Sequence, residues 1–145
     1  MKLSIAATLG LLTTLTLVSP ATAENPVHVE QLLLTGECMG CDLSGANLRG
    51  EHLIGVDLRN ANLAGADLRD TNLEGADLTG ANLEGANFDS AFLTNASLND
   101  ANLNRVNFTA AIINDADVSG ASMLYLDITN AQIYNTGIAV GGEEE

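Results

Sequence analysis

Two cysteines, Cys38 and Cys41, are the residues of this chain whose type and spacing most clearly permit chemistry, because they form a Cys-x-x-Cys motif. Such a pair can form a disulfide, take part in thiol–disulfide exchange or supply two ligands to zinc. A zinc site would need two further ligands, and the chain has only two histidines, His28 and His52. Asp42 follows the motif where covalent haem attachment requires histidine. In an exported chain we expect a disulfide that pins an N-terminal helix to the first repeats, with a redox role as the alternative.

The other polar residues give little support for an active site. His28 and His52 fall in no serine or cysteine arrangement that activates a nucleophile. Asp57 and Asp77 stand twenty residues apart and, if stacked, offer two carboxylates to calcium, but nearby Arg59 can neutralise them and a solvated acidic face is the simpler interpretation. No glycine-rich phosphate loop opens a helix, and an interior of leucine and alanine leaves no ligand cavity. The sequence therefore predicts no enzyme, no cofactor and no metal site.

The elements that position these residues follow from an uninterrupted period of five between Cys41 and Val140. Starting at Leu43, every fifth residue is apolar, for twenty consecutive units. We call this apolar residue the centre of its five-residue unit. Alanine stands two residues before this centre in thirteen units, Asn or Asp stands one residue before it in thirteen, and Gly, Asn or Asp stands two residues after it in fifteen. Repetition on this scale indicates a stacked repeat architecture.

A period of five matches neither a helix nor a flat strand. An amphipathic helix would distribute these apolar residues around its whole surface, and a plain strand would place successive centres on opposite faces. The chain must therefore bend once per unit, and the Gly/Asn/Asp position supplies the bend because these residues turn the backbone at least cost. The predicted fold is an all-β solenoid in which each coil contacts only its neighbours.

The units ADLRD, TNLEG, ADLTG, ANLEG and ANFDS, from Ala66 to Ser90, resemble the A(D/N)LXX pattern of the pentapeptide-repeat family. The resemblance covers about 100 residues. It implies a right-handed quadrilateral β-helix with four units per coil, so that residues i and i+20 stack and twenty units make about five coils. Functions within that family are diverse, so the resemblance predicts the architecture better than the biochemical role.

Residues 1–23 have the features of a secretory signal peptide. They carry one charge, at Lys2, then an apolar stretch from Leu3 to Val18 and the small-residue site Ala21-Thr22-Ala23. The stretch is short for a membrane span, although an uncleaved N-terminal anchor remains the alternative. We expect cleavage after Ala23 and no membrane contact thereafter.

Residues 24–37 predict a short capping α-helix, residues 38–140 the repeat domain, and residues 141–145 a disordered acidic tail. Asn25 suits an N-cap, Pro26 the first helical position and Gly36 the C-terminal stop. Val29, Leu32 and Leu33 are expected to face the first coil. At the other end, the bulky run Met123-Leu124-Tyr125-Leu126 is expected to plug the last coils.

Two pairs of large apolar residues stand twenty positions apart. Phe88 and Phe108 are centres and are expected to stack in the core. Phe92 and Ile112 occupy the column that is mostly Asn or Asp, so we expect them to form an outward apolar strip, flanked by Ile54 and Tyr134. Such a strip on an acidic rod predicts a site for a protein partner or for self-association, with local packing as the alternative.

Charge and compartment narrow the functional hypotheses. After removal of residues 1–23, four arginines and nineteen acidic residues give a net charge of −15, which disfavours nucleic acid and anionic membranes. The run GECMGCDLSGANLRG resembles the start of periplasmic or thylakoid-lumen pentapeptide-repeat proteins of cyanobacteria. The favoured hypothesis is a non-enzymatic exported scaffold or interaction module. The alternatives are a DNA mimic that binds a type II topoisomerase, as some members of that family do, and a redox-linked protein that uses Cys38 and Cys41.

Overall fold

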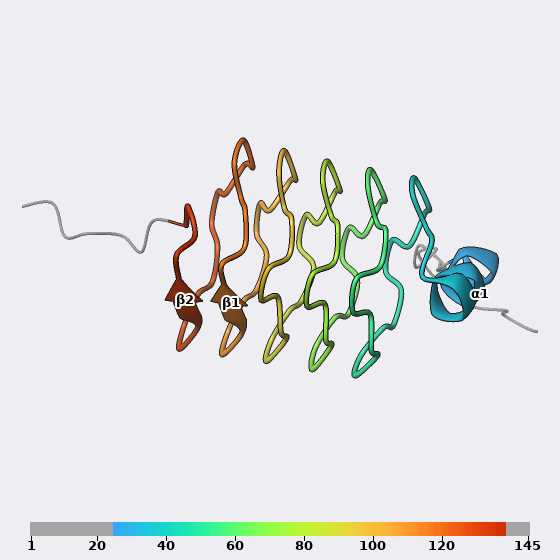
Figure 1. Ribbon diagram of the computed structural model, residues 1–145, viewed down its shortest axis with the longest axis horizontal. Helices are drawn as coiled ribbons and strands as arrows, with labels where there is room; N and C mark the ends of the chain where they lie inside the picture. Colours follow the sequence, from blue (N-terminus) through green and yellow to red (C-terminus); the bar gives the residue numbers. More distant parts are fainter. Residues whose placement is uncertain (1–24, 139–145) are drawn as a thin grey trace, which may run out of the picture.

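The computed structural model describes residues 25–138, which form one short helix followed by a stack of coils (Figure 1). The predicted signal peptide and acidic tail lie outside the described residues. The regular elements are α1 (Pro26–Thr35), β1 (Ile112–Asn114) and β2 (Gln132–Tyr134). Among the described residues, no helix is long and apolar enough to span a membrane.

The ends of α1 follow from its first and last residues. The Asn25 side chain accepts a hydrogen bond from the Val27 N–H at 3.2 Å, and Pro26 opens the helix where its missing N–H costs nothing. Gly36 ends it in the left-handed conformation, with φ of 72°, and donates its N–H to the Leu32 carbonyl at 2.9 Å. The expected cap, proline and terminating glycine are all found in these roles.

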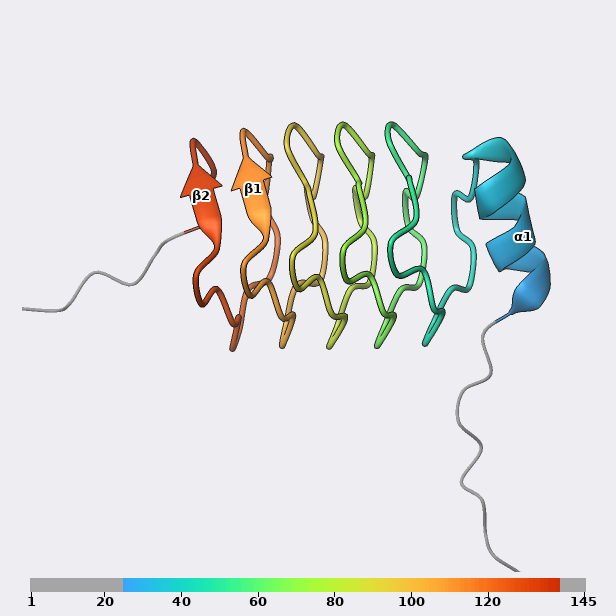
Figure 2. The same cartoon turned by 90° about the horizontal axis from the view of Figure 1, so that it is seen from below.

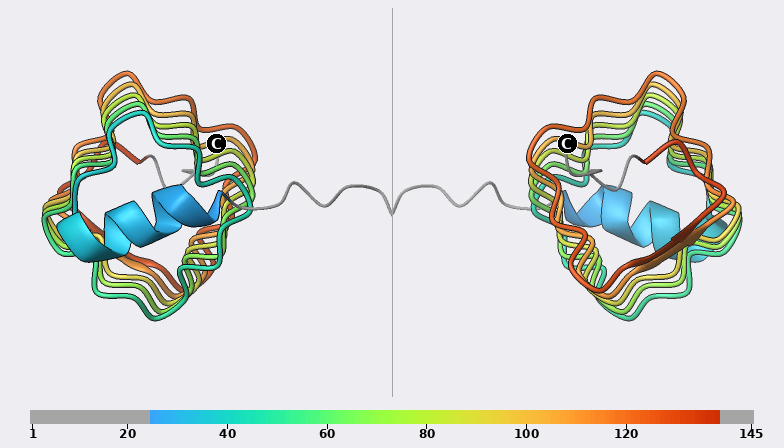
Figure 3. Two further views of the ribbon diagram at one scale, coloured as in Figure 1. Left: turned by 90° about the vertical axis from the view of Figure 1, so that its right-hand side faces the viewer. Right: turned by 90° about the vertical axis from the view of Figure 1, so that its left-hand side faces the viewer.

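Each coil contains twenty residues, because parallel β-bridges join a residue to the one twenty positions later. The residues joined in this way form four columns along the rod, one on each side of the coil. One column runs from Glu37 through Asp57 and Asp77 to Ser97 and Asp117, and the other three follow the same rule. Residues 37–138 therefore make about five coils. The coils stack in a row in Figures 1 and 2, and their outline is four-sided in the end-on views of Figure 3, with α1 lying across one end. In most coils a single residue on each side forms a bridge to the next coil. Within the described residues, only β1 and β2 pair over several consecutive residues and form strands.

The corners between sides are turns with a positive φ at every fifth residue. All twenty such positions from Gly40 to Asn135 have φ between 50° and 73°. In the turn at Gly45, for example, the Ala46 N–H donates to the Leu43 carbonyl at 3.0 Å. Glycine, asparagine and aspartate adopt this left-handed conformation most readily, which explains their dominance at this position.

The core is the column of centres together with the alanine column. Leu43, Leu83 and most other centres are fully buried, and the rings of Phe88 and Phe108 pack with their centroids 5.2 Å apart and their planes tilted by 36°. Thr71 replaces an inward alanine and is also buried, and its hydroxyl donates to the Leu68 carbonyl at 2.6 Å.

The last described coil is less well covered. Met123 and Leu126 are only partly buried against the core. The expectation that the whole run from Met123 to Leu126 plugs this end is wrong for Leu124 and Tyr125, which are exposed. Their positions, one and two residues after a centre, are turn positions whose side chains leave the solenoid.

Candidate interaction surface

Phe92 and Ile112 are bridge partners in neighbouring coils, on one flat side of the rod. Their column continues to Asn72 on one side and to Gln132 on the other. Phe92 is 45% exposed and Ile112 is half-buried. No described segment covers them.

Tyr134 extends this surface toward the last coil. It pairs with Asn114 in the β1–β2 ladder, two residues along from Ile112, and is 72% exposed. We call Phe92, Ile112 and Tyr134 the apolar patch. It spans three coils, which corresponds to a length of roughly 10 Å at the usual strand spacing.

Ile54 does not join the patch, although it was expected to flank it. It is exposed and belongs to the same column as Tyr134, but Glu74 and Thr94 stand between it and the later coils. The expected strip is therefore continuous only over its C-terminal part.

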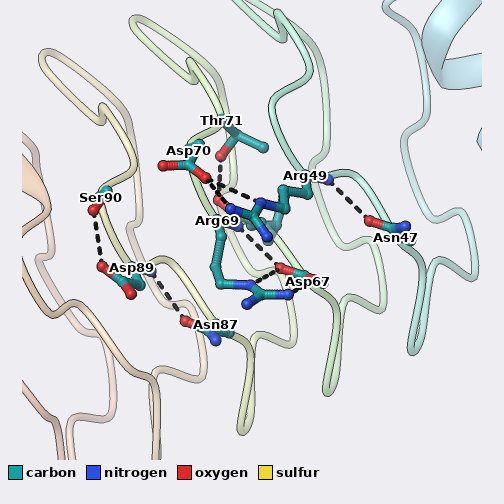
Figure 4. Close-up of polar contacts among 10 residues, drawn as sticks. Asn47, Arg49, Asp67, Arg69, Asp70, Thr71, Asn87, Asp89 and Ser90 are labelled. Atoms are coloured by element: carbon teal, nitrogen blue, oxygen red, sulfur yellow. Dashed lines mark hydrogen bonds and ion pairs between the residues drawn. The ribbon is translucent and has the colours of Figure 1, made fainter.

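Carboxylates border the apolar patch, and an arginine at the preceding corner, Arg49, is neutralised by Asp70 (Figure 4). Glu74 stands in the coil before Phe92, diagonally beside it. Asp115 follows β1 at the corner and accepts a hydrogen bond from Asn135 Nδ2 at 2.7 Å. Neither carboxylate is within ion-pair distance of a described arginine.

The four arginines of the described chain are all engaged by carboxylates elsewhere. The pairs are Arg49–Asp70 at 3.0 Å, Arg59–Asp57 at 2.6 Å, Arg69–Asp67 at 2.6 Å and Arg105–Glu84 at 3.8 Å. The pairs Arg49–Asp70 and Arg69–Asp67 lie close together in Figure 4. The charge of the rod is thus neutralised locally at these pairs and remains acidic around the apolar patch.

Arg69 binds Asp67 with two hydrogen bonds. Its Nε donates to Oδ1 at 2.8 Å and its Nη2 to Oδ2 at 2.6 Å (Figure 4). These hydrogen bonds hold the pKa of the Asp67 carboxyl below its ordinary value.

Arg59 makes the same contact with Asp57 and lies close to both of the stacked carboxylates, those of Asp57 and Asp77. Its Nε and Nη2 donate to the two oxygens of Asp57 at 2.9 and 2.6 Å, and its Nε lies 3.8 Å from Oδ2 of Asp77. The pKa of Asp57 is lowered, chiefly by this hydrogen bonding. A guanidinium thus stands where a cation between Asp57 and Asp77 would have to bind. No group of three or more potential metal ligands gathers anywhere within residues 25–138.

Cys38 and Cys41 form a disulfide, and both are buried. Both residues belong to the first coil, beyond the end of α1, so the bond staples one corner of that coil. The disulfide also touches the helix, because Cys38 Sγ lies 3.4 Å from the carbonyl oxygen of His28 in α1.

Other contacts hold α1 against the first coil. Leu32 is 1% exposed, the Asp42 N–H donates to His28 Nδ1 at 2.9 Å, and Gln31 Nε2 donates to the Glu37 carbonyl at 2.7 Å. Leu33 was expected to face the coil but is 46% exposed. Successive helical residues are rotated by about 100°, so Leu32 and Leu33 cannot both face inward.

A second exposed apolar feature, which the repeat pattern did not predict, lies around Leu124 and Tyr125. A hollow of about 110 Å³ is lined by Glu84, Asn104, Arg105, Leu124 and Tyr125, on the side of the rod opposite the apolar patch. The sequence does contain a sign of this hollow. Arg105 and Tyr125 occupy a corner column that holds glycine in the three earlier coils.

Comparison with protein families decides the classification of this rod. The model described as pentapeptide repeats matches residues 37–75, 66–105 and 101–136, in eight copies. The chain belongs to the pentapeptide-repeat family. The match thus covers the described repeats from Glu37 to within two residues of Ile138.

Two solved structures of pentapeptide-repeat proteins are similar to this one. A protein from the thylakoid lumen of Arabidopsis thaliana is 29% identical, with a TM-score of 0.59, and the match covers 61% of each chain. A protein from Nostoc PCC 7120 is also 29% identical, with a TM-score of 0.60, over 76% of this chain and 95% of the other. The present chain thus spans less than two thirds of the Arabidopsis protein. A comparison with curated protein sequences found no significant match.

Proposed function

We propose that this pentapeptide-repeat protein is a non-enzymatic interaction module that presents the apolar patch on a rigid rod. The observation that carries the proposal is that Phe92 and Tyr134 are exposed and the half-buried Ile112 lies between them, on one face. Contiguous exposed apolar side chains on a soluble rod are characteristic of contact surfaces.

The solenoid suits this role because it holds the patch in fixed geometry. Each coil is hydrogen-bonded to both neighbours, so the spacing of side chains along a face is set by the backbone and not by loops. Side chains fill the core, and the described histidines have no nucleophile beside them, which supports a binding role over a catalytic one.

The proposed compartment is the periplasm or the thylakoid lumen. The N-terminal signal-like sequence supports export, and the similar Arabidopsis protein is described as a thylakoid-lumen protein. We also infer that the coils wind to the right, as the family implies.

The test is recovery of a native partner from the exported fraction with the wild-type protein and with a Phe92→Asp/Ile112→Asp variant. We expect a binder that the folded variant loses and that, once purified, binds the wild-type protein directly. A binder that both proteins retain would place the contact elsewhere on the rod. No specific binder with either protein would refute the interaction module.

The same recovery, repeated from the cytoplasmic fraction, separates the two alternative functions. Retention of the chain in the cytoplasm together with recovery of a type II topoisomerase there would favour the DNA mimic. A partner trapped as a mixed disulfide with Cys38 or Cys41 would favour the redox-linked role.

A further inference from the structure

We propose that the partner contacts the apolar patch through a basic amphipathic helix that lies along the axis of the rod. This inference rests on the proposed function and adds the chemistry and orientation of the partner. The patch is taken as Phe92, Ile112 and Tyr134 throughout.

The charge around the patch favours a partner with a positively charged binding segment. Glu74 and Asp115 border the patch without an arginine partner, and every described arginine is already paired with another carboxylate. The whole chain has a net charge of −14. An acidic segment would meet repulsion at long and short range, whereas lysine or arginine beside an apolar stripe would be attracted by the rim carboxylates.

The spacing of the patch selects the shape of the partner. Phe92 and Ile112 are one coil apart in one column, and Tyr134 is one coil further and two residues to the side, where it can contact the flank of a helix lying along the axis. Strand-like coils are spaced by about 4.8 Å, and one turn of an α-helix advances by about 5.4 Å. Over three coils the two repeats stay within about 1 Å of register, so successive turns of an apolar helical stripe can meet successive coils.

An extended peptide fits this face less well. A strand would add to the stack through backbone hydrogen bonds, but the backbone groups on this face already bond to the coils above and below. Phe92 donates its N–H to the Thr71 carbonyl and accepts from Leu73 in the coil before it, at 2.9 and 2.8 Å. Its neighbours Ala91 and Leu93 bond in the same way to Ile112 in the coil after it, also at 2.9 and 2.8 Å. The face therefore offers side chains and no free backbone, which suits the side chains of a helix.

The probe is a synthetic leucine–lysine peptide of about 18 residues with helical periodicity, long enough for about five turns. Two control peptides accompany it: a leucine–glutamate peptide of the same pattern, and a leucine–lysine peptide of the same composition with scrambled order. Binding to the purified full-length exported protein is measured by calorimetry at roughly physiological ionic strength.

Two variants replace apolar side chains by uncharged polar ones on opposite sides of the rod. Phe92→Asn/Ile112→Asn, the patch variant, removes two of the three apolar side chains of the patch. Leu124→Asn/Tyr125→Asn is the matched control, in the hollow on the opposite side. Thermal melts establish that both remain folded. A third variant, Glu74→Gln/Asp115→Asn, removes the rim charges and keeps the patch.

We expect the periodic leucine–lysine peptide to bind the wild type and the control variant equally and the patch variant at least tenfold more weakly. We expect the rim variant to bind severalfold more weakly and with a smaller salt dependence. The scrambled and leucine–glutamate peptides should not bind measurably.

Three results would overturn the inference. They are equal binding to the wild type and the patch variant, equal binding of the scrambled peptide, and tighter binding of the leucine–glutamate peptide. If a native partner is recovered through the patch but contacts it with a neutral or acidic segment, the partner chemistry fails while the proposed function stands. If neither the peptide nor any native protein depends on the patch, both fail.

Discussion

Oδ1 of Asn60 lies in the space that a β carbon on Gly80 would need, 2.5 Å from its position. The two residues share a corner column, one coil apart, and both have positive φ. Glycine is thus favoured at residue 80 by its neighbour in the stack as well as by its backbone conformation, whereas Gly85 has nothing within 4 Å of the corresponding position.

The first prediction is that Gly80→Ala destabilises the protein more than Gly85→Ala. Both changes place alanine at a positive φ, which costs about 1 kcal/mol, but only the first also displaces the Asn60 side chain. Urea unfolding measures the difference. In an Asn60→Gly background the two substitutions should become equally costly, and a difference that persists there would show that the clash is not its cause.

The second prediction tests the register of the repeat with adjacent residues. Leu83 is fully buried and Glu84 is exposed, with only a 3.8 Å contact to Arg105. Leu83→Asp places a carboxylate in an apolar column and should abolish cooperative folding of the middle coils. Glu84→Ala should change the free energy of unfolding by less than about 0.5 kcal/mol. Comparable thermal melts for the two variants would contradict the assignment of inward and outward positions.

The third prediction concerns the acid side of the pH range. The pKa of Asp67 is lowered by its hydrogen bonds to Arg69, so this carboxylate stabilises the folded state above its unfolded pKa of about 3.9. That contribution is lost as the pH falls through the lower, folded-state pKa. Wild type should therefore exceed Asp67→Asn in stability near neutrality, and the gap should close in strong acid.

Urea midpoints of both proteins at about pH 7 and about pH 2 measure this gap. Protonation of the many other carboxylates affects both proteins alike, so the difference between them isolates Asp67. A gap of the same size at both pH values would show that the pair with Arg69 does not couple to folding.

The fourth prediction is that the disulfide acts locally. It closes a loop of four residues between Cys38 and Cys41, which corresponds to about 2 kcal/mol in the chain-entropy model. Cys38→Ala/Cys41→Ala should lower hydrogen-exchange protection in α1 and the first coil and leave the coil around Phe108 unchanged, because each coil contacts only its neighbours. Loss of protection throughout the rod would contradict this.

The period of five predicts most of the architecture, because each column has one physical task. The apolar centre fills the core, the alanine before it allows close packing, and the turn residue accepts a positive φ. The pairing of residues twenty apart came instead from the family resemblance. Nothing in a single unit of five specifies how many units close a coil.

Some predictions about individual side chains were wrong because they rested on residue size and not on position in the repeat. Leu124 and Tyr125 are large, but their columns point outward, so they do not plug the rod. Ile54 is apolar and exposed, but Glu74 and Thr94 stand between it and the later coils. The contact of His28 with Asp42 depends on how α1 docks, and no local pattern specifies that angle.

The coil of twenty residues also sets the step by which the gene for this protein can change length. Duplication of twenty codons adds one coil and leaves every later side chain on its original face. Duplication of a single five-codon unit rotates everything downstream by a quarter turn. Inserted between Phe92 and Ile112, it would move Ile112 and Tyr134 to another side and divide the apolar patch. Selection for a binding face would therefore tolerate duplications in multiples of four units and remove the others.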